Sequence, residues 1–276
     1  MSATLYLVPT PIGNLSDISD RCRETLQGVD FIAAEDTRVT LRLLNHMEIK
    51  KPLVSYYEHN KEVSGPKIVS RLLAGESCAL VTDAGSPAIS DPGEDLVRLC
   101  AEAGVTVTAI PGPCAAITAL SISALPTGRF TFEGFLSTTK KNRFAHLDSL
   151  CAEQRTMIFY EAPHKLTGTL ADLRQVFGGT RRICLCRELT KLHEEALRMT
   201  LDEAVVYYES QAPRGEYVLI VEGAQASAEP AVTQEDAVAR VQALIAQGYR
   251  KKDAVRQISA ETGFPKNALY DAVLKQ

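Results

Sequence analysis

The chain has 276 residues, of which 45% are hydrophobic and 23% charged, and its formal net charge is −4. That is enough to bury a full core in two domains with a small appendage. The acidic balance excludes a global electrostatic attraction for nucleic acid, so RNA contact depends on local basic segments. No apolar run approaches the ~20 residues of a membrane span, and nothing near the N-terminus reads as a signal peptide, so we expect a cytoplasmic protein.

The first half of the chain predicts an α/β fold. An amphipathic helix over 94–104 ends at Gly104, a frequent helix terminator. Strands that alternate with helices in this way indicate a mostly parallel sheet. The short β-rich runs expected to form it are residues 5–8, 31–34, 53–57, 79–82 and 105–110.

A second α/β series follows Pro126 and Gly128, and these residues mark the predicted boundary between a domain of residues 1–123 and one of residues 124–228. Small polar residues and Pro230 then indicate a linker over 222–231. The second series is expected to contain strands at 157–160, 183–186 and 217–221 and helices at 166–178 and 201–210.

Residues 229–276 are predicted to be a separate helical segment. Thr233 with Asp236 resembles a capping box, and the next helix reaches Gly248. Over 255–274, apolar residues flank Gly263 with the spacing of a helix-turn-helix. The alternative is a helical hairpin that packs on the enzyme or on a partner subunit.

The seven cysteines are odd in number, scattered and mostly flanked by aliphatic residues, which indicates reduced, buried thiols. Cys184 and Cys186 share one face of a predicted strand, but no second Cys or His pair completes a metal site. We therefore expect no bound metal.

Three loops rich in glycine and proline follow predicted strands, at residues 9–14, 83–93 and 111–116. In an open α/β sheet, ligands bind beyond the carboxyl ends of the strands, so these loops are expected to converge on one crevice. None contains the Lys-bearing loop of a polyphosphate site or the GxGxxG of a dinucleotide site. S-adenosylmethionine, a compact cation without phosphate, fits a loop that contains Asp83 and no basic residue; the alternative is that the loops only make tight turns.

The chain contains, in this order, the motifs VPTPIGNLSDIS, AAEDTR, SYYEHN, VTDAGSPAISDPG, IPGP, FYEAPHK and RELTKLHEE. Together these motifs resemble the ribosomal RNA small subunit methyltransferase I family, which belongs to the tetrapyrrole-methylase-like group. The resemblance spans about residues 4 to 224. It implies 2′-O-methylation of a cytidine ribose in the decoding region of 16S rRNA in the small (30S) subunit, with S-adenosylmethionine as methyl donor and a homodimeric enzyme.

The resemblance also implies which residues surround the cofactor. It places one loop around the methionine moiety, a second segment after Pro113, and two residues of the second domain as the closure of the pocket. Relatives usually have Ser where this chain has Cys114. The residues implied are Pro11, Asp83, Ala84, Gly85, Ala88, Cys114, Ala115, Tyr160 and Glu161.

Two charged clusters directly after apolar strands are candidates for catalysis and RNA contact. One contains Glu35 and Arg38, the other Arg187 and Lys191. We expect Glu35 or Lys191 to accept the proton of the ribose hydroxyl, with ion pairing between domains or subunits as the alternative for each. The predicted RNA contacts are Arg38, His59, Arg187, Arg250, Lys251, Lys252 and Lys266.

Residues 248–276 hold six basic and three acidic side chains, a local charge of +3 that is expected to attract RNA phosphates. Two other functions remain open. A tetrapyrrole methyltransferase shares the expected fold, because fold alone does not fix function. A metabolite-sensing DNA-binding regulator would also use a helix-turn-helix, although the acidic chain disfavours strong duplex binding.

Overall fold

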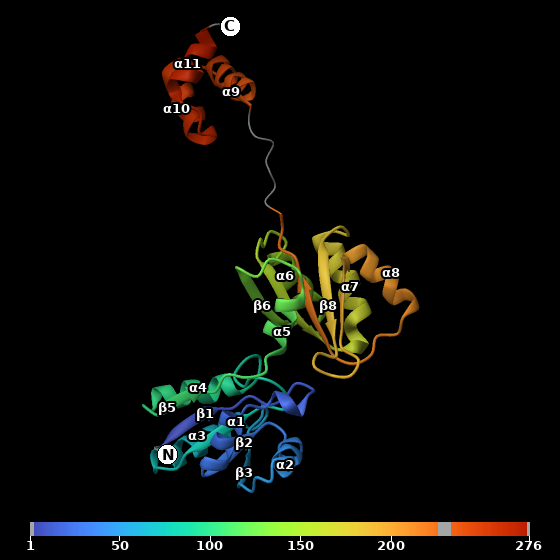
Figure 1. Cartoon of the computed structure of the whole chain (residues 1–276). Coiled ribbons are helices and arrows are strands. Elements are labelled where there is room, and N and C mark those ends of the chain that lie inside the picture. Colours follow the sequence, from blue (N-terminus) through green and yellow to red (C-terminus); the bar gives the residue numbers. More distant parts are fainter. Residues whose placement is uncertain (1–2, 226–232, 275–276) are drawn as a thin grey trace. The chain divides into compact units, whose positions relative to one another are not determined.

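The computed structural model describes residues 3–225 and 233–274, which form two compact units, Met1–Ala224 and Gln225–Gln276. The first unit contains two sheets, shown in Figure 1. The predicted boundary at residues 228/229 lies outside the described residues, as do Pro230 and most of the predicted linker. The boundary at 123/124 stays a prediction.

The first sheet is entirely parallel, with the order β3-β2-β4-β1-β5. The central strands FIAA and CALV are apolar throughout and buried at every position, as expected for strands covered on both faces. All five strands match predicted runs to within two residues at either end. They are β1 (Thr4–Leu7), β2 (Phe31–Ala34), β3 (Leu53–Ser55), β4 (Cys78–Val81) and β5 (Thr106–Ala109).

Helices cover both faces of this sheet. On one face, α1 (Asp20–Gly28) and α2 (Thr37–His46) bury Leu26 and Leu44 against β2 and β4. On the other, α3 (Lys61–Leu73) and α4 (Gly93–Glu102) pack Leu72 and Leu96 against the same strands. A short 3₁₀ turn, η1 (Leu15–Asp17), follows β1. The helices cover the faces of the sheet, and the loops extend from the carboxyl ends of its strands.

The second sheet has the order β6-β7-β10-β8-β9 and mixed direction. Only β6 and β7 run parallel; the other neighbours are antiparallel. The sequence predicted the three central strands but missed both edges, because FTFEGF contains a glycine and EALRMT mixes charged with apolar residues. The strands are β6 (Phe130–Phe135), β7 (Thr156–Glu161), β8 (Arg182–Arg187), β9 (Glu195–Thr200) and β10 (Tyr217–Val221).

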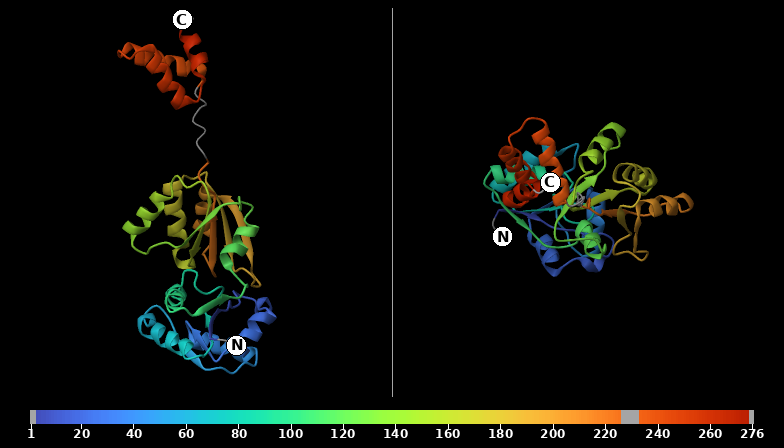
Figure 2. Two further views of the ribbon diagram at one scale, coloured as in Figure 1. Left: turned by 90° about the vertical axis from the view of Figure 1, so that its left-hand side faces the viewer. Right: turned by 90° about the horizontal axis from the view of Figure 1, so that it is seen from above.

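Three helices pack on one face of the second sheet: α6 (Lys140–Ser149), α7 (Pro163–Phe177) and α8 (Leu201–Ser210). The opposite face is covered by α5 (Ala115–Ile122), which precedes residue 124 in the chain yet packs against this sheet. Figure 2 gives two further views of this arrangement. The two-sheet α/β architecture confirms the predicted fold class.

The second unit is a three-helix cluster of α9 (Gln234–Ala246), α10 (Lys251–Thr262) and α11 (Lys266–Leu274). The capping box is present, since Thr233 Oγ1 accepts from the Asp236 backbone and the Asp236 carboxylate accepts from that of Thr233. Gly263 ends α10 in the left-handed conformation, at φ 76°. Its turn brings Ile258 and Leu269 into one buried cluster, the packing expected of a helix-turn-helix.

Five of the seven free cysteines are buried, Cys114 is half-buried and Cys151 is exposed, so the expectation of buried thiols fails at Cys151. Within residues 3–225 and 233–274, no group of three or more potential ligands is arranged to hold a metal ion. No helix in the described part of the chain is long and apolar enough to cross a bilayer.

Candidate active site

The three glycine- and proline-rich loops meet beyond the carboxyl ends of the first sheet, as predicted. Thr10 and Gly85 exchange backbone hydrogen bonds of 2.9 and 3.0 Å. The Ser86 hydroxyl donates to the Pro113 carbonyl at 2.9 Å. A Cβ on Gly112 would lie 2.4 Å from Pro9 Cγ, so glycine permits the first and third loops to approach. A pair of backbone hydrogen bonds and one bond from a serine hydroxyl to a backbone carbonyl thus join the loops into one wall.

A cavity of about 560 Å³ opens between this wall and the second sheet. Its volume lies within the range of small-molecule sites, which are concave and mostly apolar. The lining residues come from both sheets and their loops: Ile12, Glu35, Thr82, Asp83, Ala84, Gly85, Ser86, Ile89, Ser90, Asp91, Cys114, Ala115, Phe135, Tyr160, Glu161, Ala162, Pro163, Cys186, Leu189, Glu216, Tyr217 and Val218.

The charged side chains that line the cavity are all acidic. Among the described residues, those that line it include five carboxylates and no lysine, arginine or histidine. A polyphosphate would meet repulsion there, whereas a compact cation would be attracted. The five carboxylates are Glu35, Asp83, Asp91, Glu161 and Glu216.

Glu35 and Asp83 follow neighbouring strands, β2 and β4, which explains why they meet. Glu35 Oε2 accepts a hydrogen bond from Thr82 Oγ1 at 2.7 Å. Asp83 Oδ1 accepts from the Asp36 backbone N–H at 3.2 Å. Burial, with the nearby charge of Glu35 as a further cause, raises the pKa of Asp83 above its ordinary value. A cation bound beside Asp83 would favour the charged carboxylate and so counteract the effects of burial and of Glu35 on its pKa.

The loop after β4 has a constrained backbone. Ala88 and Ser90 adopt left-handed conformations, at φ 67° and 63°, which are costly for residues with a Cβ and often occur at functional sites. Asp91 Oδ1 accepts from the Gly93 N–H at 2.6 Å. A Cβ on Gly93 would come within 3.0 Å of the Ala88 nitrogen. Loop and helix start are therefore fitted closely together.

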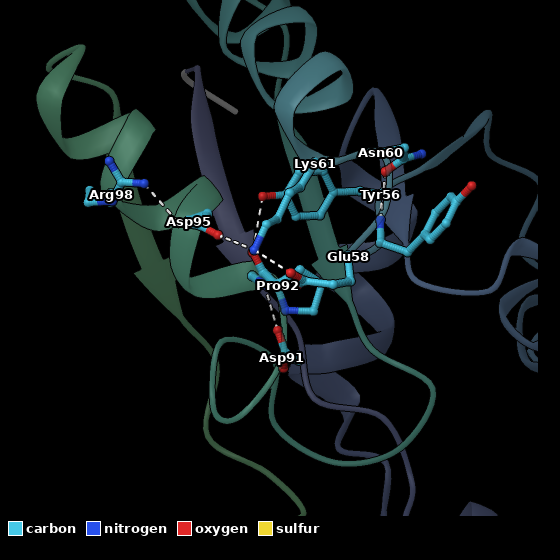
Figure 3. A network of polar contacts seen from close by, with 10 residues as sticks. Tyr56, Glu58, Asn60, Lys61, Asp91, Pro92, Asp95 and Arg98 are labelled. Atoms are coloured by element: carbon cyan, nitrogen blue, oxygen red, sulfur yellow. Dashed lines mark hydrogen bonds and ion pairs between the residues drawn. The ribbon is translucent and has the colours of Figure 1, made fainter. Parts of the chain in front are cut away.

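A polar network, drawn in Figure 3, connects the end of this loop and the start of α4 to Tyr56 and Lys61. The Tyr56 hydroxyl donates to the Pro92 carbonyl at 3.0 Å, and its side chain is buried. Lys61, at the start of α3, pairs with Asp95 in the first turn of α4 at 2.8 Å and with Glu58 at 2.7 Å. The motif SYYEHN thus has a clear structural role beside the cavity.

The second-domain wall uses side chains rather than backbone. The Tyr160 ring lies 5.1 Å from that of Phe132 and 5.5 Å from that of Phe135, centroid to centroid. Burial raises the pKa of Tyr160 to about 12, so its hydroxyl stays protonated at neutral pH. Glu161 is buried and accepts from the Ala162 backbone at 2.8 Å and from Thr169 Oγ1 at 2.5 Å, which fixes its carboxylate at the start of α7.

Most of the residues implied by the resemblance line the cavity, together with Glu35. Pro11 and Ala88 belong to the same loops but are not among the lining residues. Of the two neighbours of Pro11, Thr10 hydrogen-bonds to the backbone of Gly85, and Ile12 lines the cavity. The residues that do line it are Asp83, Ala84, Gly85, Cys114, Ala115, Tyr160 and Glu161.

Lys191 lies off the cavity wall and does not suit the role of proton acceptor. Its ammonium donates to Glu188 and Glu216, both at 2.9 Å. Burial alone would lower the pKa of Lys191, but these two carboxylates outweigh it and raise the pKa. Glu35 is therefore the candidate that remains. A Cβ on Gly13 would lie 2.5 Å from Lys191 Cγ, so Lys191 does mark a contact between the two halves of the unit.

The predicted RNA contacts of the first unit are outside the cavity wall as well. Arg38 is well exposed and pairs with Asp36 at 2.7 Å. The His59 ring packs edge-on against Tyr57, with centroids 6.2 Å apart. Arg187 pairs with Glu195 at 3.3 Å.

The remaining predicted RNA contacts belong to the second unit. Arg250, Lys252 and Lys266 are exposed. Lys251 is half-buried, with its ammonium 5.2 Å from the centre of the Tyr270 ring.

Sequence reasoning missed several residues of the wall. Phe135 ends a strand that was not predicted, and Glu216 directly precedes β10 without a motif of its own. Asp91 lies in the loop 83–93, and an acidic residue one position before Pro-Gly could have been recognised as a helix-start signal.

The comparisons with known proteins agree with this geometry. Residues 4–205 match the model of the tetrapyrrole (corrin/porphyrin) methylases. Over nearly the whole chain, the sequence is similar to proteins named ribosomal RNA small subunit methyltransferase I. The chain belongs to this family of methyltransferases.

Three of these relatives illustrate the match. The Synechocystis protein is 47% identical and the alignment covers 98% of this chain and 97% of that one. For Halalkalibacterium halodurans the identity is 48%, with 97% and 93% covered. For Escherichia coli O157:H7 it is 46%, with 99% and 95% covered.

Solved structures with the same fold are more distant in sequence. Uroporphyrin-III C-methyltransferase from Thermus thermophilus aligns with a TM-score of 0.57 at 17% identity, covering 80% of this chain and 94% of that one. A structure of that enzyme described as complexed with S-adenosyl homocysteine gives 0.56 at 14% identity, covering 79% and 96%. These likenesses confirm the fold.

Proposed function

We propose that this methyltransferase binds S-adenosylmethionine in the cavity and methylates the 2′-hydroxyl of a cytidine ribose in the 16S rRNA of the small ribosomal subunit. The observation that carries the cofactor assignment is the cavity itself, which has five carboxylates and no basic residue on its wall. The rRNA substrate is supported by the names of relatives that match this chain almost from end to end.

The residues present fit this cofactor. The loop segment from Thr82 to Ser86 would hold its polar groups, with the Asp83 carboxylate close to the positive charge. When bound, the cofactor supplies an electrophilic methyl group on a sulfonium. The protein excludes water and aligns the acceptor, and such positioning alone can provide a large share of the rate enhancement.

Glu35 is the proposed proton acceptor. It lies on the cavity wall, and its hydrogen bond from Thr82 fixes one carboxylate oxygen while leaving lone pairs on the other. Removal of the ribose hydroxyl proton by such a group commonly contributes ~10²–10⁴-fold in rate.

The direct test is methyl transfer from labelled S-adenosylmethionine to 30S subunits from a strain that lacks this protein, followed by nucleoside analysis. We expect label in 2′-O-methylcytidine. Naked 16S rRNA in parallel shows whether the assembled subunit is required. Label in a base, or none despite measurable cofactor binding, would contradict the proposed acceptor, and a coloured macrocycle retained on purification would favour a tetrapyrrole substrate.

The second unit is proposed to contribute RNA affinity through Arg250, Lys251, Lys252 and Lys266. Replacing these four with Gln should weaken binding to 30S subunits and lower the salt dependence of that binding, while the affinity for S-adenosylmethionine stays unchanged. Unchanged affinity and salt slope would contradict the assignment, and a helical hairpin that packs on protein would then be favoured. A homodimer, testable by sedimentation, and a cytoplasmic location accompany this proposal.

A further inference from the structure

The last strand residue before α6, Phe135, is turned toward the cavity by an irregularity in β6. In the parallel pairing with β7, Phe132 lies opposite Ile158, but Gly134 lies opposite Phe159 and Phe135 opposite Tyr160. Glu133 is the extra residue of a β-bulge. Side chains alternate between the faces of a regular strand, so without the bulge Phe132 and Phe135 would point to opposite sides.

With the bulge, both phenyl rings contact Tyr160. Gly134 makes this possible through its left-handed φ of 63°. A Cβ on Gly134 would also lie 3.3 Å from Ser90 Oγ, so the end of β6 lies against the constrained loop of the first domain. The irregularity thus brings one aromatic ring to the place where the two walls meet.

On either side of this contact stands an exposed apolar side chain. Phe135 is 58% exposed and Ile89, next to Ser90, is 52% exposed, yet both line the cavity. Large apolar side chains exposed at the mouth of the cavity leave hydrophobic area in water, which a flat ligand with apolar faces would cover.

We infer that Phe135 and Ile89 form a stacking site for the nucleobase of the nucleotide whose ribose is methylated; this rests on the proposed function. A base has an apolar face for Phe135 and Ile89. An unstacked base of single-stranded RNA commonly stacks on an aromatic side chain. Stacking at the mouth would leave the attached ribose at the entrance to the carboxylate-lined interior. The other possible base is the adenine of the cofactor, and the experiment separates the two.

The test compares Phe135→Ala, Ile89→Ala and Phe135→Tyr in the full-length protein. The matched control is Phe130→Ala, which removes a 40% exposed phenyl ring from the other end of the same strand, away from the lining residues. For each, KM and kcat are measured with 30S subunits, and the dissociation constant of S-adenosylmethionine by calorimetry. A second readout is the quenching of a short single-stranded RNA that carries a fluorescent cytidine analogue, bound to protein saturated with S-adenosylhomocysteine.

We expect Phe135→Ala to raise KM for the subunit about tenfold, in line with the measured effect of removing one stacking ring, and to abolish the quenching. Ile89→Ala should act in the same direction but less. Phe135→Tyr should restore both readouts, and Phe130→Ala should match the wild type. Cofactor affinity should not change in any variant.

Equal weakening of S-adenosylmethionine binding by Phe135→Ala would overturn the inference and assign the ring to adenine. Wild-type KM and quenching in Phe135→Ala would overturn it as well. If the wild type fails to methylate 30S subunits, the proposed function fails, while the quenching measurement still decides whether Phe135 stacks on an RNA base.

Discussion

The two walls of the cavity differ in structure: one is made of hydrogen-bonded loops and the other mainly of aromatic side chains. On the first-domain side, loops joined by backbone hydrogen bonds carry Glu35 and Asp83, and a network around Tyr56 and Lys61 braces them from behind. On the second-domain side, the surface is set by aromatic side chains on β6 and β7. A backbone wall is intolerant of added atoms, whereas an aromatic wall tolerates substitutions that keep its planar faces. We therefore expect changes to the loop backbone, Glu35 or Asp83 on the first wall to affect cofactor binding and chemistry, and changes to Phe135 on the second wall to affect binding of the acceptor.

The largest expected effect is on the chemical step. Glu35→Gln keeps the shape and an acceptor for Thr82 but removes the base, so kcat should fall ~10²–10⁴-fold. Cofactor affinity should change far less, as measured by calorimetry. Glu216→Gln is the control, because it removes a carboxylate from the exposed side of the same cavity. Comparable losses in the two variants would show that general charge, rather than proton acceptance, explains the effect.

A smaller but still large effect is expected from crowding the backbone wall. In Gly93→Ala, the new methyl group would meet Asp91 Oδ1 at 2.7 Å and Leu80 Cδ2 at 2.9 Å. Such overpacking typically costs ~1–3 kcal/mol, and here it would also displace the loop that lines the cavity. Both the melting temperature and the affinity for S-adenosylmethionine should fall.

Gly168→Ala serves as its control, because nothing lies within 4 Å of the added Cβ inside α7. That variant should be at least as stable as the wild type. Normal cofactor affinity in Gly93→Ala would mean that the loop adjusts freely, which contradicts a rigid first wall.

The charge of Asp83 predicts a pH dependence of cofactor binding. The raised pKa means that Asp83 loses its charge at a higher pH than an ordinary aspartate does. Cofactor affinity should therefore fall as the pH drops through this raised pKa, and binding should release protons. Asp83→Asn should weaken binding and flatten the profile. An unaltered profile in that variant would remove Asp83 from the cation site.

The raised pKa of Asp83 has the opposite effect on the stability of the cofactor-free protein, which falls rather than rises as the pH increases. Between the ordinary value of 3.8 and the raised one, the folded state binds more protons at Asp83 than the unfolded state does. Raising the pH through this window therefore costs stability. Melting temperatures measured against pH with and without cofactor distinguish the rise in cofactor affinity from the loss of stability of the free protein.

The two walls also differ in how much of their structure can be predicted from the sequence. Loops 9–14, 83–93 and 111–116 follow apolar strands, and their convergence is predictable because the ends of parallel strands share one edge. Phe135 was not predictable in this way. Its direction depends on a bulge at Glu133, which is a property of the pairing between two strands rather than of either segment alone. The binding of Lys191 by Glu188 and Glu216 is similar, since Glu216 is distant in sequence.

The smallest expected effect concerns the brace behind the first wall. Tyr56→Phe removes only the hydroxyl that donates to Pro92, and Lys61→Met removes the ion pair with Asp95. One hydrogen bond contributes about 1 kcal/mol net, so each variant should weaken S-adenosylmethionine binding several-fold while KM for the 30S subunit stays unchanged. Arg71→Met is the control, because it breaks the ion pair with Glu76 at the other end of α3. If all three variants lower the melting temperature and only the first two weaken cofactor binding, the network positions the loop; equal binding in all three would reduce it to a general support of the fold.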